Sequence, residues 1–299
     1  MHKSTALILS MLVAAALSSC GGSGEGEKPS PTVPYSYAYA VPVDDGDGWA
    51  AANAGDEGLN VGLLESMMSF IHNAGQDEYL RNILIIRNNR LVFEEYFQGV
   101  QKNSLSHLQS ATKSVVSAIF GIAVANGSVG SVGDALFDYF PEYQHLNNPD
   151  KAGVTLQHVL SMTPGFDWNE ISTPVNGEEN DNVAGHRSNN FIEYLLKKDI
   201  VTDPGTAWYY NSGCPMLLAG IVRNQAGIHI DEFAAQYLFG PMGIQSLRWE
   251  YQSDGLPLAT GGLWMRARDS AKFGQLFLDG GTWDGQQLIP ESWVSASWT

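Results

Sequence analysis

The spacing of apolar residues predicts an amphipathic helix followed by a β-hairpin as the first ordered elements of the chain. The helix spans residues 59–75, where apolar positions recur every three or four residues. Two apolar runs then flank Asn88 and Asn89 within residues 82–97, a pattern typical of two antiparallel strands joined by a tight turn. Two strands alone are marginally stable in water. We therefore expect either that the C-terminal helices cover this hairpin or that the natural chain continues past Thr299 and supplies further strands.

Helical periodicity dominates the rest of the sequence. Residues 110–127 are apolar on nearly every side, which predicts a buried helix. From about residue 128 to 255, short amphipathic segments alternate with long loops, of which residues 169–190 form a polar and acidic one. Two further helical segments follow at 268–281 and 290–298. The pattern predicts a mixed protein whose middle part is mainly helical.

The first 58 residues differ in composition from the remainder. A short basic start precedes an apolar run too short to span a bilayer, and the letters LSSC, which end at Cys20, resemble a bacterial lipoprotein processing box. The resemblance implies removal of a signal peptide of residues 1–19, a lipid on Cys20, and anchoring in the bacterial cell envelope, on the periplasmic or outer-membrane face. An ordinary signal peptide with an incidental cysteine is the alternative. Residues 20–58 are interpreted as a flexible linker, which leaves 59–299 for the folded domain.

Charge and motif content exclude several classes of protein. The 299 residues carry 32 acidic and 16 basic side chains, a formal net charge of −16, whereas nucleic-acid binding needs a basic face. We therefore expect no nucleic-acid partner. The sequence has no zinc-protease His-Glu pair, no C-x-x-C and no phosphate-binding loop, so we expect neither a metal nor a cofactor. The only cysteine besides Cys20 is Cys214, and no internal disulfide can form once Cys20 is lipidated.

One short motif carries candidate chemistry. Ser110 precedes Lys113 by three residues, and no other lysine of the chain has a serine at that spacing. At the start of a helix these positions lie on one face, so Ser Oγ and Lys Nζ can reach each other. The helix N-terminus favours negative charge on the serine oxygen, and burial disfavours the ammonium form of a lysine, which can then accept a proton. The alternative is an N-cap serine beside a lysine that extends to solvent, although the neighbours Val115 and Val116 make an uninvolved charge costly there.

Four stretches resemble, in this order, the serine hydrolases of the β-lactamase-like superfamily, in the branch of class C β-lactamases, related esterases and 6-aminohexanoate-dimer hydrolases. They are QSATKSVVSAIFGIAV, LQHVLSMTPGFDWNE, DPGTAWYYNSGCPMLLAGIV and GGLWMRARDSAKFGQLFLDGGTWDGQQLIPESWV, and the resemblance covers roughly residues 59–299. It implies a β-lactamase/transpeptidase-like α/β (α+β) fold, in which an antiparallel sheet is flanked by helices and carries an inserted all-helical lobe at about 128–255. It also implies Ser110 as the acyl-accepting nucleophile, Lys113 as its partner, and a tyrosine of the helical lobe as a second acid and base.

The register of the motif selects between two adjacent tyrosines. Relatives resemble P-G-T-x-F-x-Y, with two aliphatic residues seven and eight positions after the tyrosine. Counting from Pro204 places that tyrosine at Tyr210, and Leu217 and Leu218 follow at the expected distances. Side chains of an extended segment alternate between faces, so Tyr209 is expected to pack the loop or line the entrance of the cleft. A surface position for both tyrosines is the alternative.

Further binding residues are predicted from their places beside these motifs. We expect five residues to contact substrate: Ser212, Asn211, Tyr209, Trp168 and Gly262. Three histidines without a recognisable serine–acid partnership are interpreted as capping or surface residues: His107, His158 and His186.

The expected function is hydrolysis of a small-molecule amide, ester or peptide through a Ser110 acyl-enzyme, with Lys113 and Tyr210 as acid and base. The third motif of the similar family, a Lys/His-x-Gly strand that lends an oxyanion N–H and a cation, is not found before Thr299. We therefore expect a C-terminally truncated sequence with an incomplete sheet. The alternative function is a non-catalytic envelope lipoprotein that uses the same cleft to bind peptidoglycan or a peptide.

Overall fold

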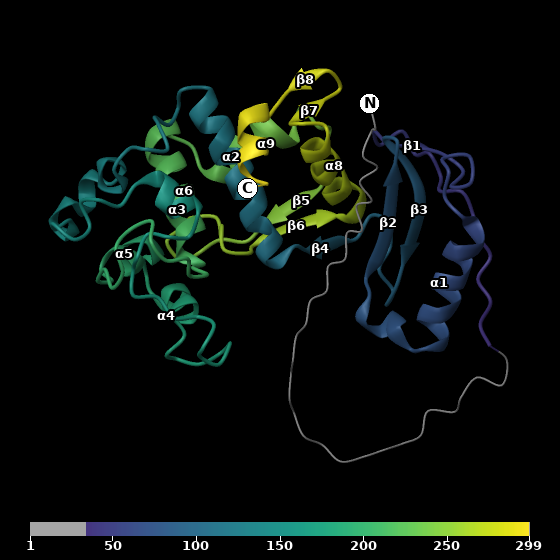
Figure 1. The fold of residues 1–299 in the computed structure, drawn as a ribbon, viewed down its shortest axis with the longest axis horizontal. Coiled ribbons are helices and arrows are strands. Elements are labelled where there is room, and N and C mark those ends of the chain that lie inside the picture. Colours follow the sequence, from purple (N-terminus) through teal and green to yellow (C-terminus); the bar gives the residue numbers. More distant parts are fainter. Residues whose placement is uncertain (1–33, 299) are drawn as a thin grey trace, which may run out of the picture. The chain divides into compact units, whose positions relative to one another are not determined.

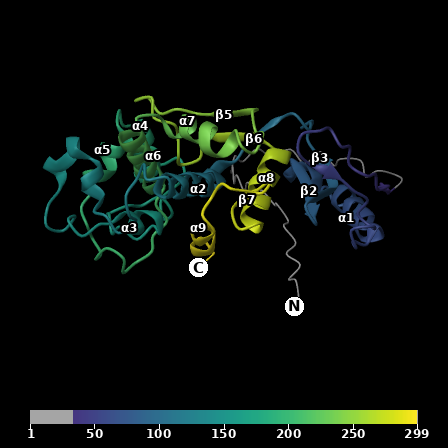
Figure 2. The same ribbon diagram turned by 90° about the horizontal axis from the view of Figure 1, so that it is seen from above.

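A computed structural model describes residues 34–298 of the chain (Figures 1 and 2). The expected signal peptide, Cys20 and the first part of the expected linker lie outside the described residues. Within the described part, contacts group the chain into two compact units. Unit 1 consists of residues 34–104 and 266–275, and unit 2 consists of residues 105–265 and 276–298.

Unit 1 is built around a hairpin. Its elements in chain order are β1 (Ala50–Ala51), α1 (Val61–Asn73), the 3-10 helix η1 (Gln76–Tyr79), β2 (Asn82–Arg87), β3 (Arg90–Tyr96) and most of α8 (Ala267–Leu278). The strand order is β1-β3-β2, in which β2 and β3 pair antiparallel and β1 lies parallel to β3. Asn88 and Asn89 join β2 to β3 with φ of 51° and 59°, the left-handed conformation that asparagine tolerates in tight hairpin turns. The predicted hairpin is confirmed.

Helices cover both faces of this sheet. Successive side chains of a strand point to opposite faces, and β2 shows this alternation. Ile83 and Ile85 pack in a cluster with Leu64, Met68 and Ile71 of α1. Leu84 and Ile86 pack with Trp49 and Leu91 on the other side, against Ala267 and Ala271 of α8. Figure 1 shows α1 alongside β2 and β3. The expected arrangement of an antiparallel pair flanked by helices is therefore present in unit 1.

The expected linker at 20–58 is wrong for residues 34–58, which are part of unit 1. Trp49 is only 3% exposed, and its indole Nε1 donates a hydrogen bond of 3.0 Å to the carbonyl oxygen of Arg268. The hydroxyl of Tyr39 donates to a carbonyl oxygen of β3 at 2.9 Å. These contacts come from scattered aromatic residues without a helical or strand period, which is why the pattern did not reveal them.

Unit 2 is mainly helical. Its helices are the 3-10 turn η2 (Gln109–Ala111), α2 (Thr112–Ala125), the 3-10 helices η3 (Leu136–Tyr139) and η4 (Pro141–Leu146), α3 (Leu156–Leu160), α4 (Asp181–Arg187), α5 (Phe191–Leu196), α6 (Gly213–Ala226), α7 (Ile230–Ala234), the π-helical η5 (Ala235–Phe239) and α9 (Glu291–Ala296). Its strands are β4 (Leu105–His107), β5 (Leu247–Trp249), β6 (Leu263–Arg266), β7 (Thr282–Trp283) and β8 (Gln286–Gln287). The last residue of β6 belongs to unit 1.

The core of unit 2 lies between α2 and α6. Nine of the 14 residues of α2 and ten of the 14 residues of α6 are buried, which places both helices inside the unit. α6 packs against α2, α3 and α5 (Figure 1). The predicted buried helix is confirmed, although it begins at Thr112, because Ser110 lies in the preceding 3-10 turn. Among residues 34–298, no helix combines the length and the apolar character needed to cross a bilayer.

Short elements account for the remaining differences from expectation. β5 lies inside the segment 128–255 that was expected to be all-helical, and α4 lies inside the expected loop 169–190. β5 pairs antiparallel with β6 in a three-stranded sheet of order β4-β6-β5. Three- and four-residue strands are too short to show a clear alternation, so the sequence pattern missed this second sheet.

Candidate active site

Three residues from two distant parts of the sequence meet at one hydroxyl in unit 2. The Tyr210 hydroxyl donates a hydrogen bond to Ser110 Oγ at 2.9 Å, and Lys113 Nζ donates to the same oxygen at 3.2 Å. Ser110 is exposed, whereas Lys113 and Tyr210 are half-buried. The predicted catalytic residues are thus brought together at hydrogen-bond distance, with the serine oxygen open to solvent.

The backbone before the serine has an unusual conformation. Gln109 adopts φ of 49°, a left-handed conformation that few residues other than glycine adopt. The chain before it is attached to β6, because the N–H of Leu108 donates to the carbonyl oxygen of Leu263 at 2.9 Å. The turn delivers Ser110 to the N-terminal end of α2, where the helix dipole favours negative charge on a nearby oxygen.

Lys113 lies in the first turn of α2 and has two further neighbours. Its Nζ donates a short hydrogen bond to the backbone carbonyl of Thr260 and lies 5.2 Å from the centroid of the Tyr210 ring. Within the described part of the chain, Lys113 forms no ion pair with a carboxylate. A lysine amine that is oriented toward a serine hydroxyl and not neutralised by an acid can exchange protons with that hydroxyl.

The two adjacent tyrosines have different partners. Whereas Tyr210 reaches Ser110, the Tyr209 hydroxyl donates to Asn169 Oδ1 at 3.4 Å. The backbone N–H of Tyr209 donates to the carbonyl oxygen of Met162 at 3.1 Å, which attaches the loop to the residues that follow α3. Trp208 is 64% exposed, and its ring centroid lies 6.5 Å from that of Tyr210. The geometry therefore agrees with the register that selects Tyr210.

The expected substrate residues lie along two separate cavities of unit 2. Ser212 and Gly262 line a cavity of about 200 Å³ that also contains Ser110 and Lys113. A Cβ atom on Gly262 would come within 2.6 Å of Leu258 Cβ, so the backbone approaches closely there, as expected. The other three, Trp168, Asn211 and Tyr209, line a cavity of about 310 Å³ that continues along Trp208.

Two histidines lie in a different environment from the one that the sequence pattern predicts. His107 and His186 are half-buried and line the Ser110 cavity, so their interpretation as capping or surface residues is wrong. The His107 ring stacks on Trp264 at 4.6 Å, and His186 Nε2 lies 3.4 Å from Thr260 Oγ1. They come from β4 and α4, two short elements that the pattern did not predict. His158 is a capping residue as expected, since its Nδ1 accepts from the N–H of Thr155 at 3.2 Å.

Cys214 is close to the site but is not a rival nucleophile. It is 1% exposed, and burial, with a smaller contribution from the carboxylate of Glu170, raises the pKa of its thiol well above the usual range. The neutral thiol is weakly nucleophilic. Of the two side chains, Ser110 is therefore the exposed candidate nucleophile.

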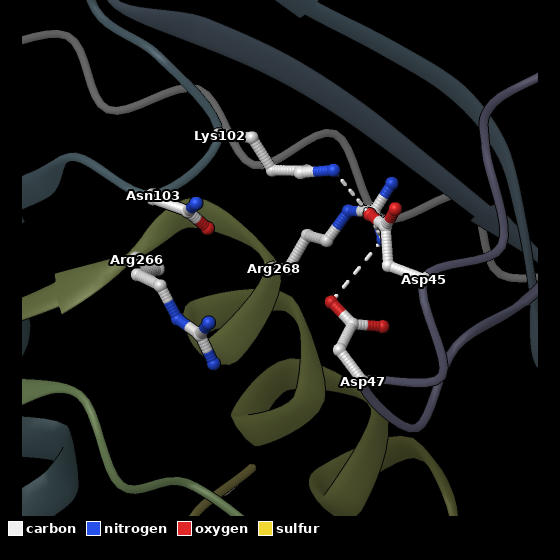
Figure 3. A pocket seen from close by; sticks show the side chains of 6 residues that line it. All are labelled: Asp45, Asp47, Lys102, Asn103, Arg266 and Arg268. Carbon is white, nitrogen blue, oxygen red and sulfur yellow. Dashed lines mark hydrogen bonds and ion pairs between the residues drawn. The ribbon is translucent and has the colours of Figure 1, made fainter.

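A charged cavity of about 320 Å³ in unit 1 is another candidate for a site (Figure 3). Its six lining residues are Asp45, Asp47, Lys102, Asn103, Arg266 and Arg268. The Arg268 guanidinium pairs with Asp45 and Asp47 at 3.0 and 3.2 Å, and its other nitrogens bond the carboxylate of Glu94. Arg266 pairs with Asp269 at 2.6 Å. Because these charges are satisfied by one another, we interpret the cluster as a structural attachment of the chain around residue 45 to α8 and β3.

No metal site competes with the serine site within residues 34–298, where no group of three or more His, Cys, Asp or Glu side chains could hold an ion.

Comparison with known proteins places this geometry in a family. The sequence profile described as Beta-lactamase matches residues 82–297, which include Ser110, Lys113 and Tyr210. The chain belongs to the β-lactamase family. Among curated relatives, the 6-aminohexanoate-dimer hydrolase of Paenarthrobacter ureafaciens is 25% identical over 221 residues, covering 71% of this chain and 55% of that protein. An uncharacterised protein of Alkalihalophilus pseudofirmus is 22% identical over 237 residues, which cover 70% of this chain and 61% of that protein. This β-lactamase-family chain therefore spans less than two thirds of the length of these curated relatives.

Solved structures show the same fold. A Bacillus anthracis protein provisionally assigned as a 6-aminohexanoate-dimer hydrolase superposes with a TM-score of 0.63 at 23% identity, over 72% of this chain and 58% of that one. A penicillin-binding protein from Bacillus halodurans superposes with a TM-score of 0.59 at 17% identity, over 77% and 78% of the two chains. The expected mixed α/β fold of the β-lactamase and penicillin-binding-protein type is confirmed.

Proposed function

We propose that this β-lactamase-family protein is a serine hydrolase that cleaves an amide or ester bond through an acyl-enzyme on Ser110. The observation that carries the proposal is the convergence of the Tyr210 hydroxyl and Lys113 Nζ on Ser110 Oγ, at 2.9 and 3.2 Å. A nucleophile within hydrogen-bond reach of its base is the arrangement that covalent catalysis needs. The name of the Paenarthrobacter relative supports an amide substrate.

The reaction that this geometry supports has two halves. Ser110 Oγ attacks the substrate carbonyl carbon while its proton passes to the Lys113–Tyr210 pair, and the carbonyl oxygen takes the negative charge. The tetrahedral intermediate collapses when Tyr210 donates a proton to the leaving amine or alkoxide. Water then attacks the acyl carbon, loses a proton to the same pair, and releases the acid as the proton returns to Ser110.

Two features of the site lower the cost of these steps. Lys113 Nζ and the Tyr210 hydroxyl both bond Ser110 Oγ, at 3.2 and 2.9 Å, so the lysine lies close enough to stabilise negative charge that develops on the phenol oxygen. The N-terminal end of α2 lies directly after Ser110, and its dipole stabilises the negative charge of the attacking serine oxygen. We expect the substrate to be a small molecule or peptide, since the Ser110 cavity is about 200 Å³.

A substrate panel tests the proposal. Full-length wild type is assayed against the 6-aminohexanoate dimer, a β-lactam, a D-amino peptide and a short aryl ester. We expect hydrolysis of at least one of these and a loss of roughly 10³-fold or more in kcat for Ser110→Ala, because the nucleophile is removed.

Ser114→Ala is the matched control, because Ser114 is an exposed serine on the same helix. This variant should retain wild-type rates. Equal turnover by wild type and Ser110→Ala would refute the proposal, and so would binding of the peptide without turnover of any member of the panel, which would favour the non-catalytic alternative.

A further inference from the structure

We propose that Glu170 is a positioning residue for Tyr210, whose carboxylate holds the catalytic loop in register. The inference rests on the proposed function, because it assumes that Tyr210 acts as acid and base on Ser110. Neither the sequence motifs nor the family comparison assigns a task to this glutamate. The observation that points to it is a set of hydrogen bonds to the segment that begins two residues after Tyr210.

The Glu170 carboxylate accepts three hydrogen bonds. Oε1 accepts from the Ser212 hydroxyl at 2.8 Å, and Oε2 accepts from the Ser212 backbone N–H at 2.9 Å. The third bond comes from the indole Nε1 of Trp168 at 2.7 Å, also to Oε2. Trp168 is buried, and its ring packs beside Phe191 and Tyr194, so the third bond fixes the carboxylate itself against a rigid part of the helical core.

The backbone around Tyr210 is therefore held on both sides. The N–H of Tyr209 is bound to the Met162 carbonyl at 3.1 Å, and the N–H of Ser212 is bound to Glu170 at 2.9 Å. Ser212 is also the N-cap residue of α6, yet its hydroxyl does not cap the helix and bonds Glu170 instead. Because the two attachments enclose Tyr210, its hydroxyl is directed to Ser110 by the loop rather than by contacts of its own ring alone.

The charge of Glu170 is compensated without a basic partner. In the part of the chain that the structure describes, no lysine, arginine or histidine forms an ion pair with Glu170. The carboxylate instead lies at the N-terminal end of the 14-residue helix α6, where backbone N–H groups and the helix dipole favour an anion. Its segment is fixed in turn, because the N–H of Asn169 donates to Asp181 Oδ2 at 2.6 Å. The glutamate is thus an acceptor that joins its own loop to the N-terminal end of α6.

Two substitutions separate hydrogen bonding from charge. Glu170→Ala removes all three bonds, so the loop loses one of its two attachments. Glu170→Gln keeps an oxygen for the Ser212 and Trp168 N–H groups, and its NH₂ group can donate to the Ser212 hydroxyl, which accepts as well as donates. If Glu170 acts by position, Gln should preserve the site and Ala should not.

The experiment compares steady-state kinetics of the full-length variants. A displacement of about 1 Å in a catalytic group can cost on the order of 100-fold in rate, so we expect Glu170→Ala to lower kcat by roughly 10- to 100-fold with KM changed less than about threefold. Glu170→Gln should stay within about threefold of wild type. The matched control is Glu178→Ala, on the same acidic loop with a side chain that is 92% exposed, and it should match wild type.

A double-mutant cycle tests whether Glu170 acts through Tyr210. In a Tyr210→Phe background the hydroxyl is already missing, so Glu170→Ala should cause little further loss of kcat, whereas a general structural role would give additive losses. If Glu170→Ala does not fold, as judged by its circular dichroism, Ser212→Ala replaces it in the same cycle. That variant removes one bond of the three, and we expect a loss of about two- to tenfold.

Three results would overturn the inference: an unchanged kcat for Glu170→Ala, a loss for Glu170→Gln as large as that for Ala, or additive losses in the cycle. These outcomes are distinct from failure of the proposed function. If Ser110→Ala is as active as wild type, the serine mechanism itself is wrong. If Ser110→Ala is inactive while Glu170→Ala keeps wild-type kcat, only the positioning assignment fails.

Discussion

At the residue scale, the two adjacent tyrosines in the loop before α6 differ in the hydrogen-bond partner of their hydroxyl groups. Tyr210 bonds Ser110 Oγ at 2.9 Å, and Tyr209 bonds Asn169 at 3.4 Å. We expect Tyr210→Phe to lower kcat by roughly 10²- to 10⁴-fold, the range for loss of a general acid–base group. Tyr209→Phe should change kcat by less than about threefold.

The same assay decides the register of the motif. Both substitutions remove one hydroxyl from the same loop, so each variant is the control for the other. A large loss in Tyr209→Phe with normal kcat in Tyr210→Phe would show that the neighbouring tyrosine carries the acid–base function.

Motif spacing and the family resemblance predicted Ser110, Lys113 and Tyr210, which the structure brings together, but not the residues around them. Ser110 and Lys113 are three residues apart, one in the 3-10 turn before α2 and one in its first turn, so local geometry brings them together. Tyr210 follows from the register of the motif that resembles the family. Glu170 and His186 were not predicted, because they reach the site only through tertiary folding. Glu170 bonds Ser212 from 42 residues away, a distance over which no helical or strand period carries information.

At the scale of elements, a single tyrosine connects η3 to the turn before it. The Tyr139 hydroxyl donates to Asp134 Oδ2 at 2.7 Å and accepts from the N–H of Gly130 at 3.1 Å. Burial, and then the hydrogen bond to Asp134, raise the pKa of Tyr139 to about 12. An unfolded tyrosine has a pKa of about 10. The folded protein therefore holds this proton more tightly than the unfolded chain does.

This difference predicts a loss of stability in alkali. The contribution of Tyr139 is fully present below pH 10 and is lost as the pH rises through 12, and it amounts to about 2.7 kcal/mol at most. Urea unfolding of wild type and Tyr139→Phe at several pH values from 9 to 12 measures it. The free energy of unfolding should fall less steeply with pH in the Phe variant, and parallel curves for the two proteins would exclude this role of Tyr139.

Long elements were predictable, whereas several of the short ones were not. α1 and α2 have 13 and 14 residues, enough for several turns of apolar periodicity, and the hairpin turn at Asn88 and Asn89 carries its own residue signature. β4 and β5 have three residues each, and α4 has seven in a polar segment. Their positions depend on partners elsewhere in the chain, as in the pairing of β5 with β6.

At the scale of the whole molecule, the fold class could be predicted from the sequence motifs but not from the composition. A net charge of −16 argues against nucleic acid but leaves the fold open. Residues 34–58 were expected to be a flexible linker because the segment contains glycine and proline. In the structure, Trp49 of this segment is buried and bonds the backbone of Arg268. A few aromatic contacts suffice to order such a segment, and no periodic sequence pattern predicts these contacts.

The central claim is that Ser110 is an activated nucleophile, and covalent trapping tests it most directly. The full-length protein is treated with a fluorophosphonate probe, digested, and mapped by peptide mass spectrometry. The account predicts an adduct on Ser110 in wild type and in Ser114→Ala, and none in Ser110→Ala. Equal labelling of Ser110→Ala and wild type would contradict it.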